Sequence, residues 1–401
     1  MELNWNLVFL LFCHLQAPPD MFALQERVNT LFASHHESSY EKSKSKTAIE
    51  CEDFLKHIGS SITECLPQEV CLYLAWKDGS GKTPVHNNSC PAIGNRSEIC
   101  KCKTRLAWGT VQYKISHLRA VFESMGRLGP WHESSRTGNP MDSQAIQIYA
   151  KQIKVEQSKA HVLTKQATPM FQNKLRLIAM YIDRCLHHDP CKPSKQVFIL
   201  ARDQALLKMM FFGGDRASDI GQMLCQEVKQ LPNKQGVTIR HTWGKTHRCD
   251  RPNVFSLFRC HEEIICPVLG LQTYIETAAK LGVNIKQGFL FRLMAGEKIL
   301  DRPMSYAAVY DRLKHYLDVL NINGGETPHS LRAGCAITLK NAAKNTQAVM
   351  QHIGWASEAS ASHYTRSAQV EQTTVAATCM RLSQQNGPKE FVDDTTLPNA
   401  I

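Results

Sequence analysis

The sequence lacks the long apolar run that a membrane-spanning protein needs. Crossing a bilayer takes about 18–20 consecutive apolar residues, and the 401-residue chain contains no such run. The short apolar stretch from Leu7 to Phe12 lacks the basic flank of a secretory signal, because Glu2 precedes it without any lysine or arginine. The sequence also shows no internal repeat. We therefore expect neither a membrane protein nor a secreted one.

A disulfide framework is not indicated either, although the chain has 15 cysteines. Their number is odd, and most lie singly in apolar stretches, as do Cys185, Cys225, Cys266 and Cys335. This pattern is typical of reduced thiols in a core. Hydrophobic residues make up 43% of the chain, which is enough for two or three folded domains. The net charge of +11 lies mostly after residue 170, which favours a polyanionic partner.

The first half of the chain predicts a helical domain after an irregular start. Residues 1–40, with Pro18-Pro19, indicate a loose leader, and residues 45–160 a domain that begins with two short helices. An amphipathic helix is predicted over 106–125, and Asp142 or Ser143 can cap another. A polar link follows at about 156–168.

The second half predicts a larger domain over 170–375 and a polar tail over 376–401. Helical patterns cover 175–186, 267–282, 304–320 and the stretch from 330 to the end of the 360s. Residues 236–243 and 253–258 alternate like two β-strands on either side of a polar tip.

One group of residues has the chemistry of metal ligands. His86, Cys90, Cys100 and Cys102 fall within 17 residues. Zinc takes four nitrogen or sulfur ligands in a tetrahedron, and ligand pairs on tight turns can supply them. The surrounding segment has too few hydrophobic residues to fold alone, which favours a metal cross-link. The spacing is not that of the common Cys-x-x-Cys pairs, so a chance group of buried thiols is the alternative.

The landmarks around this group resemble the ALOG domain. They are Lys82-Thr-Pro-Val-His86, Cys90-Pro91, Cys100-Lys-Cys102, Arg105-Leu-Ala-Trp108-Gly109, Leu118-Arg119 and Gly138-Asn139-Pro140, within about residues 45–160. The resemblance implies an all-helical DNA-binding domain with a zinc-ribbon insert, whose structural zinc is held by His86, Cys90, Cys100 and Cys102. Such domains occur in plant developmental regulators and in recombinases of DIRS-type retroposons.

Six basic residues lie in this insert and in the helix that follows it: Arg96, Lys101, Lys103, Arg105, Lys114 and Arg119. Basic side chains grouped in this way can contact the phosphates of DNA. An ordinary solvated surface is the alternative.

Six residues in the second half follow one another in a fixed order: Arg216, Lys245, His329, Arg332, Trp355 and Tyr364. Arginine can hold two non-bridging phosphate oxygens at once. Negative charge grows on these oxygens in the transition state of phosphoryl transfer. A tyrosine can attack a phosphate and later leave again, and a positioned acid can protonate a departing 5′-oxygen. Each residue alone is a weak signal for this chemistry. A lone tyrosine, for example, is more often a half-buried packing residue than a nucleophile.

Taken together over about residues 170–370, these motifs resemble the tyrosine recombinase, or phage-integrase-like, catalytic domain. The resemblance implies that Tyr364 forms a 3′-phosphotyrosyl link while Arg216 and Arg332 hold the non-bridging oxygens. It further implies that Lys245 is the general acid, that His329 assists proton transfer and that Trp355 packs against the site. Lys234 and Arg248 flank Lys245 and are alternative candidates for the general acid, whereas Arg216 and Arg332 have no such rivals in their motifs.

Other positions near these motifs carry secondary expectations. Asp219 is expected to orient Arg216, and His352 to lie on a helix surface. Ala333-Gly334 stand where many relatives have His-Ser, and Trp355 where prokaryotic members have His. Both departures resemble the eukaryotic retroposon and Crypton-type branch.

The predicted fold is therefore α+β and mostly helical, with a helical DNA-binding domain and a catalytic domain that contains a small antiparallel sheet. The predicted function is DNA strand cleavage and rejoining for a mobile element, without a cofactor for catalysis. We expect double-stranded DNA as partner, each domain on one side of the duplex, a homo-tetramer on DNA and a nuclear location. The alternatives are a domesticated sequence-specific DNA-binding regulator without catalysis and a monomeric enzyme like the type IB topoisomerases.

Overall fold

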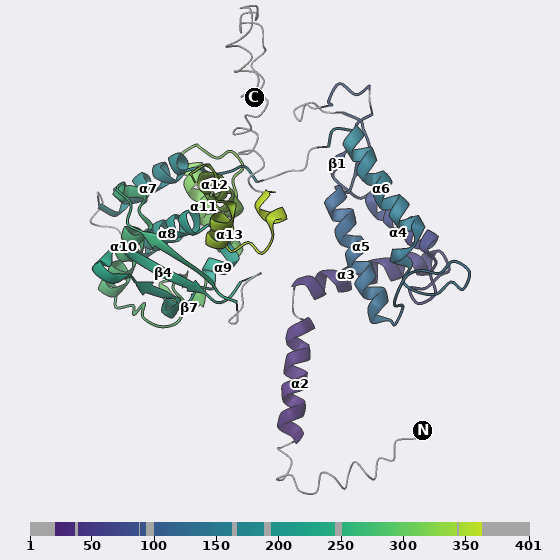
Figure 1. Cartoon of the computed structure of the whole chain (residues 1–401), viewed down its shortest axis with the longest axis horizontal. Helices are drawn as coiled ribbons and strands as arrows, with labels where there is room; N and C mark the ends of the chain where they lie inside the picture. The colour runs from purple at the N-terminus through teal and green to yellow at the C-terminus, as the bar shows by residue number, and fades with distance from the viewer. Residues whose placement is uncertain are drawn as a thin grey trace, which may run out of the picture. The chain divides into compact units, whose positions relative to one another are not determined.

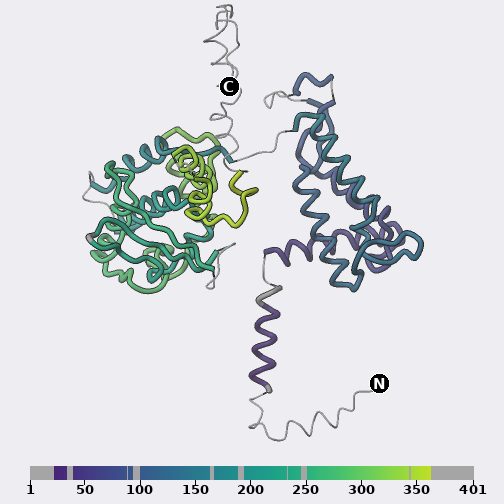
Figure 2. Tube along the Cα trace, in the orientation of Figure 1, coloured from purple at the N-terminus to yellow at the C-terminus, as the bar shows by residue number. Residues whose placement is uncertain are grey.

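The computed structural model of the chain is drawn in Figure 1, and Figure 2 gives the same view as a tube. It describes residues 21–36, 39–87, 89–93, 100–162, 167–187, 194–244, 251–342 and 345–362. The chain divides into two compact units, Met1–Lys165 and Gln166–Ile401. Within the described ranges, no helix is long and apolar enough to cross a membrane.

The N-terminal unit is helical, as predicted. Its helices are α2 (Met21–His36), α3 (Ser39–His57), α4 (Pro67–Asp78), α5 (Trp108–Ser124) and α6 (Gln144–Lys159). α3 packs against α4 and α5, and α6 packs against the same two helices. The predicted amphipathic helix is confirmed as α5, which buries Val111, Ile115, Leu118 and Phe122. These side chains form one core with residues of α3, α4 and α6, among them Leu55, Tyr73 and Ile146.

The irregular leader predicted for residues 1–40 is wrong over Met21–His36, which forms α2. Leu24, Val28 and Leu31 recur at spacings of four and three, and no glycine or proline interrupts the segment, so a helix is the favoured local structure. All three side chains remain exposed. α2 therefore adds no large side chain of this stripe to the core.

The predicted cap of α6 is confirmed at Ser143. Its side-chain oxygen accepts a hydrogen bond of 3.3 Å from the backbone N–H of Ile146, which satisfies a donor that the helix itself leaves open. Ile146 is buried, and Tyr149 packs against the same core. The polar link predicted from residue 156 starts too early, because α6 continues to Lys159.

The C-terminal unit is built around α8 (Ser194–Gly213), which is buried along most of its length. α7 (Gln172–His187), α10 (Pro267–Lys280) and α12 (Pro328–Ala342) pack against it (Figure 1). The remaining named helices are α9 (Ala217–Gly221), α11 (Tyr306–Val319) and α13 (Thr346–Ile353). The core gathers large side chains, including Phe198, Phe211, Tyr274, Phe291 and Tyr316.

In the described part of this unit, two small antiparallel sheets accompany the helices. One has the order β3 (Val228–Gln230), β4 (Gly236–His241) and β5 (Asn253–Phe258), and the other pairs β6 (Arg292–Ala295) with β7 (Lys298–Pro303). The strand pair predicted around the polar tip is confirmed as β4 and β5, with Ile239 opposite Phe255. Both of these side chains are buried, so the alternation places one face of the sheet against the helices.

Candidate active site and candidate metal centre

The segment that joins α8 to α9 carries the first candidate arginine. It spans residues 212–216, which are the last two residues of α8 and the turn into α9, and is called the connector below. Gly214 has a φ of +62°, and a Cβ there would lie 3.2 Å from the Cys335 sulfur, so the turn requires glycine. The turn places Arg216 at the N-cap of α9. Nη1 of Arg216 donates a hydrogen bond of 3.2 Å to the carboxylate of Asp219. Asp219 is buried, and its carboxylate therefore orients the arginine, as the resemblance implies.

Arg332 on α12 contacts the same connector. Its side chain is buried, with an exposed fraction of 1% for the residue. Nη1 donates to the carbonyl oxygen of Gly214 and, at 3.3 Å, to that of Ile353. The guanidinium carbon lies 5.5 Å from the centroid of the Trp355 ring, a distance typical of a cation–π contact. One arginine thus joins α12 to the connector and to the end of α13.

Trp355 reaches Arg332 because α13 ends at a glycine. Gly354 adopts the left-handed conformation, with a φ of +74°, which terminates the helix. The buried Trp355 then packs in a small core with Cys335 and Val349. His329 is half-buried and lies one helical turn before Arg332 on α12.

The structure therefore brings Arg216, Arg332 and Trp355 together at one connector, with His329 on the adjoining turn of α12. Lys245 and Tyr364, the other two predicted catalytic residues, lie outside the described residues. Their roles stay predictions that rest on the order of the motifs.

His352 is not the helix-surface residue that we expected. Its Nε2 lies 2.7 Å from the carbonyl oxygen of Phe212, and its ring packs against Phe255 with 5.1 Å between the centroids. The side-chain amide of Asn253 donates a hydrogen bond of 3.2 Å to the His352 carbonyl. This side of α13 is covered because β5 packs there, so His352 ties α13 to the connector and to the sheet.

A buried polar pair next to Arg216 was missed by the sequence reasoning. Asp215 and His241 are 1% and 0% exposed, with 3.5 Å between Oδ1 and Nδ1. Nε2 of His241 lies 3.1 Å from the carbonyl oxygen of Asp219. Burial alone would lower the pKa of His241, but hydrogen bonding and charge from Asp215, together with Glu227 and Asp219, raise it.

This arrangement suits an anionic phosphoryl group. Arginine holds non-bridging oxygens with paired hydrogen bonds, and oriented cations in a site with little water stabilise the charge of a transition state strongly. The neighbouring Cys335 offers no competing nucleophile, because burial raises the pKa of its thiol to about 12.

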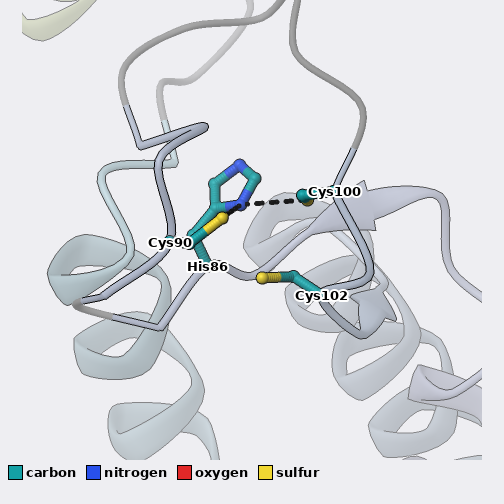
Figure 3. A group of neighbouring side chains, drawn as sticks. All are labelled: His86, Cys90, Cys100 and Cys102. Atoms are coloured by element: carbon teal, nitrogen blue, oxygen red, sulfur yellow. Dashed lines mark hydrogen bonds between the residues drawn. The ribbon is translucent and has the colours of Figure 1, made fainter.

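The four predicted metal ligands also come together in the N-terminal unit. They lie in loops beside the short ladder of β1 (Thr83–Pro84) and β2 (Thr104–Arg105). The ligand atoms of His86, Cys90, Cys100 and Cys102 all lie within 4.8 Å of one another, and the four side chains converge (Figure 3). Nδ1 of His86 lies 3.4 Å from the sulfur of Cys90 and 3.4 Å from that of Cys100.

These residues fit a structural zinc. With Zn–S near 2.3 Å and Zn–N near 2.0–2.1 Å, tetrahedral angles place sulfur and nitrogen about 3.6 Å apart. A hydrogen bond with the Asn87 backbone, followed by contacts with His86 and Cys90, lowers the pKa of Cys102 to about 7. The lowered pKa favours the thiolate, which is the form that binds a metal. A zinc held here would cross-link the loops on both sides of the ladder.

The basic residues near this centre fall into two groups. Lys101 and Lys103 are exposed. Arg105, Lys114 and Arg119 pair with the acidic groups of Asp78, Glu50 and Asp142 at 3.5, 3.2 and 2.9 Å. The Lys114 side chain is only 13% exposed, which indicates a role in the fold rather than on DNA. Arg96 lies outside the described residues.

Comparisons with known proteins match the two units to two families. The ALOG domain matches residues 29–155, and the phage integrase family matches residues 195–371. Protein LIGHT-DEPENDENT SHORT HYPOCOTYLS 5 of Arabidopsis thaliana is 33% identical over 135 residues, which are 32% of this chain and 71% of the plant protein. Protein G1-like5 of Oryza sativa subsp. japonica is 29% identical over 102 residues, 25% of this chain and 47% of the rice protein.

Among solved structures, the XerH site-specific recombinase bound to a palindromic difH substrate matches with a TM-score of 0.51 and 17% identity. The match covers 80% of this chain and 74% of XerH. At this identity the likeness shows the fold, which is that of the tyrosine recombinases. The chain belongs to the ALOG family through its N-terminal unit and carries a phage integrase family domain, of the tyrosine recombinase class, in its C-terminal unit. The domain limits 45–160 and 170–375 stay predictions.

Proposed function

We propose that this protein cleaves and rejoins DNA strands through a 3′-phosphotyrosyl intermediate, in the recombination or integration of a mobile element. The observation that carries the proposal is the convergence of Arg216 and Arg332 on one connector. Arg216 follows the turn at Gly214, and Arg332 donates to the Gly214 carbonyl oxygen. Two arginines fixed in this way can hold the non-bridging oxygens of one phosphate.

In the proposed reaction, the phenolic oxygen of Tyr364 attacks phosphorus while the bond to the 5′-oxygen breaks. Lys245 protonates the departing 5′-oxygen, and His329 assists proton transfer by taking up the proton that the phenol loses. The phosphotyrosyl ester keeps the energy of the broken linkage. A 5′-hydroxyl from a second strand can therefore attack the ester, release Tyr364 and complete an exchange without a cofactor.

The surroundings of the two arginines support this assignment. Asp219 accepts the hydrogen bond that orients Arg216, and Trp355 covers the guanidinium of Arg332. These contacts orient the two guanidinium groups before DNA binds. The arginines therefore need little reorganisation when negative charge develops on the phosphate.

The proposal also assigns DNA binding to the ALOG unit. A structural zinc held by His86, Cys90, Cys100 and Cys102 would fix the loop that carries Lys101 and Lys103, whose exposed side chains suit phosphate contacts. Exchange between two duplexes requires several active sites, so the proposed assembly is a tetramer on DNA. The proposed location is the nucleus, where such a substrate lies.

Covalent trapping tests the proposal. The protein is incubated with nicked suicide duplexes that cover the termini of the element, and the products are resolved on a denaturing gel. We expect a covalent adduct with the wild type and none with Tyr364→Phe. Tyr306→Phe is the control, because Tyr306 is an exposed tyrosine at the start of α11. A wild type that binds DNA without forming an adduct would contradict strand cleavage and favour the DNA-binding regulator. Relaxation of supercoils without strand exchange would contradict recombination.

A further inference from the structure

Asp215 and His241 occupy positions where the fold calls for apolar side chains. His241 follows Val237 and Ile239 on the buried face of β4, and all three side chains are buried. A buried ion pair is weak evidence for stability, because the free energy needed to remove both charges from water is about as large as their mutual attraction. The pair therefore needs a reason other than packing.

The surroundings of the His241 ring favour its protonated form. Nε2 lies 3.1 Å from the carbonyl oxygen of Asp219, and Nδ1 lies 3.5 Å from the carboxylate of Asp215. The carbonyl oxygen of Asp219 accepts the proton on Nε2, whereas 3.5 Å between Nδ1 and the Asp215 carboxylate is the distance of an ion pair and not of a hydrogen bond. An imidazolium gains from both contacts, because its charge is opposite to that of the carboxylate.

The other groups around the ring agree with a positive charge. Glu227, in the turn Cys225–Glu227, is buried and accepts hydrogen bonds from Thr242. β5 contributes only the neutral Asn253, which is paired with His241 in the sheet register. Two cations lie next to this pair along the connector: Arg216, whose Nη1 is bonded to the Asp219 carboxylate, and Arg332, which donates to the carbonyl oxygen of Gly214, the residue before Asp215.

The two contacts of His241 lie on either side of Arg216. Asp215 directly precedes the arginine, and Asp219 closes the first turn of α9 through a backbone hydrogen bond of 3.0 Å to the Arg216 carbonyl. A helix as short as α9 has little stability of its own. We propose that His241, with Asp215, is a positioning residue that fixes this turn and thereby aims Arg216 at the scissile phosphate. The inference rests on the function proposed above.

A double variant separates positioning from packing. Asp215→Leu with His241→Val replaces the buried pair by apolar side chains, so we expect the melting temperature and the affinity for uncleaved DNA to be kept. Single-turnover formation of the covalent adduct should slow by roughly 10- to 100-fold, because a small misplacement of a catalytic group has an effect of this size. Ile239→Val, on the same strand and face, is the control and should keep the wild-type rate. An adduct rate within threefold of wild type in the double variant would overturn the inference.

The pH profile adds a readout that packing alone would not change. The wild-type rate should fall as rising pH removes the proton from His241, and this limb should be missing in the double variant but present in Ile239→Val. Identical limbs in all three proteins would contradict the positioning role.

A second measurement does not depend on cleavage. Nitrogen NMR of histidine-labelled full-length protein, assigned with His241→Asn, should show both ring nitrogens of His241 protonated near pH 7. In arginine-labelled protein, the side-chain Nε–H signal of Arg216 should shift in Asp215→Asn and stay in place in Ile239→Val. A neutral His241, or an unmoved Arg216 signal, overturns the inference. If the wild type forms no adduct, the proposed function fails, while these spectra still decide for or against the positioning pair.

Discussion

Replacing Arg332 by lysine keeps the positive charge and removes the planar fork. In the structure, one guanidinium nitrogen donates to the carbonyl oxygens of both Gly214 and Ile353, and the group packs over Trp355. A lysine ammonium is a compact donor on a flexible stem. We expect it to reach one of these carbonyls and leave the other without its donor.

The expected loss has two parts of different size. A buried acceptor left without its partner costs about 1–3 kcal/mol, so the free energy of unfolding of the C-terminal unit should fall by that amount. Removing one oriented donor from a developing anion slows a reaction by about 10²- to 10³-fold. Domains are typically stable by about 5–15 kcal/mol, so Arg332→Lys stays folded and the slower adduct formation is not a consequence of unfolding.

Arg202→Lys is the matched control. Arg202 is 3% exposed in the same unit, bonds to Asp203 and donates a hydrogen bond of 3.0 Å to the Arg292 carbonyl. Its replacement should cost a similar free energy of unfolding and keep the adduct rate. The measurements are urea unfolding and single-turnover adduct formation at saturating DNA. Equal adduct rates in the two variants would refute the reasoning.

Three further predictions concern other parts of the chain. Cys100→Ser should release the zinc and lower the melting temperature of the N-terminal unit, and metal analysis that finds unchanged zinc would contradict the metal centre. Gly354→Ala should lower the free energy of unfolding by about 1–2 kcal/mol in urea titrations, because a side chain is forced into the left-handed region; unchanged stability would show that the turn tolerates a Cβ. Burial, followed by the charges of Lys114 and Lys44, lowers the pKa of His117. As the pH falls below about 6.5, the unfolded chain therefore binds a proton at His117 before the folded chain does. The free energy of unfolding should then fall by up to about 1.4 kcal/mol per pH unit. Thermal melts of His117→Asn should lack this slope, and an unchanged slope would contradict the role of the histidine.

The elements that sequence patterns predict well are those with one buried face. α5 and the β4–β5 pair each alternate between core and solvent, so their periods can be read directly. α8 was missed because nearly every side chain from Phe198 to Gly213 is buried, which removes the contrast between faces that marks a helix. The β6–β7 pair was missed because its side chains are mostly partly buried and show no clean alternation.

The sequence predicts which residue types form the candidate site, but it does not predict the contacts between them. The order of the motifs names Arg216 and Arg332, but the bond from Arg332 to Gly214 spans 118 residues, and no local pattern reports it. Asp215 and His241 carried a weaker signal. His241 lies on the inward face of a predicted strand, where a polar residue conflicts with the apolar pattern. Its partner Asp215 can be identified only from the structure, in which the connector lies against β4.

The connector also determines when the site can exist during synthesis. Arg216 leaves the ribosome long before Arg332 and His352, which hold the carbonyl oxygens of Gly214 and Phe212. Contacts between segments so distant in sequence form late in folding. A nascent chain thus contains Arg216 before Arg332 can join it, and an enzyme of the proposed activity becomes able to cleave DNA only after its C-terminal segments have folded.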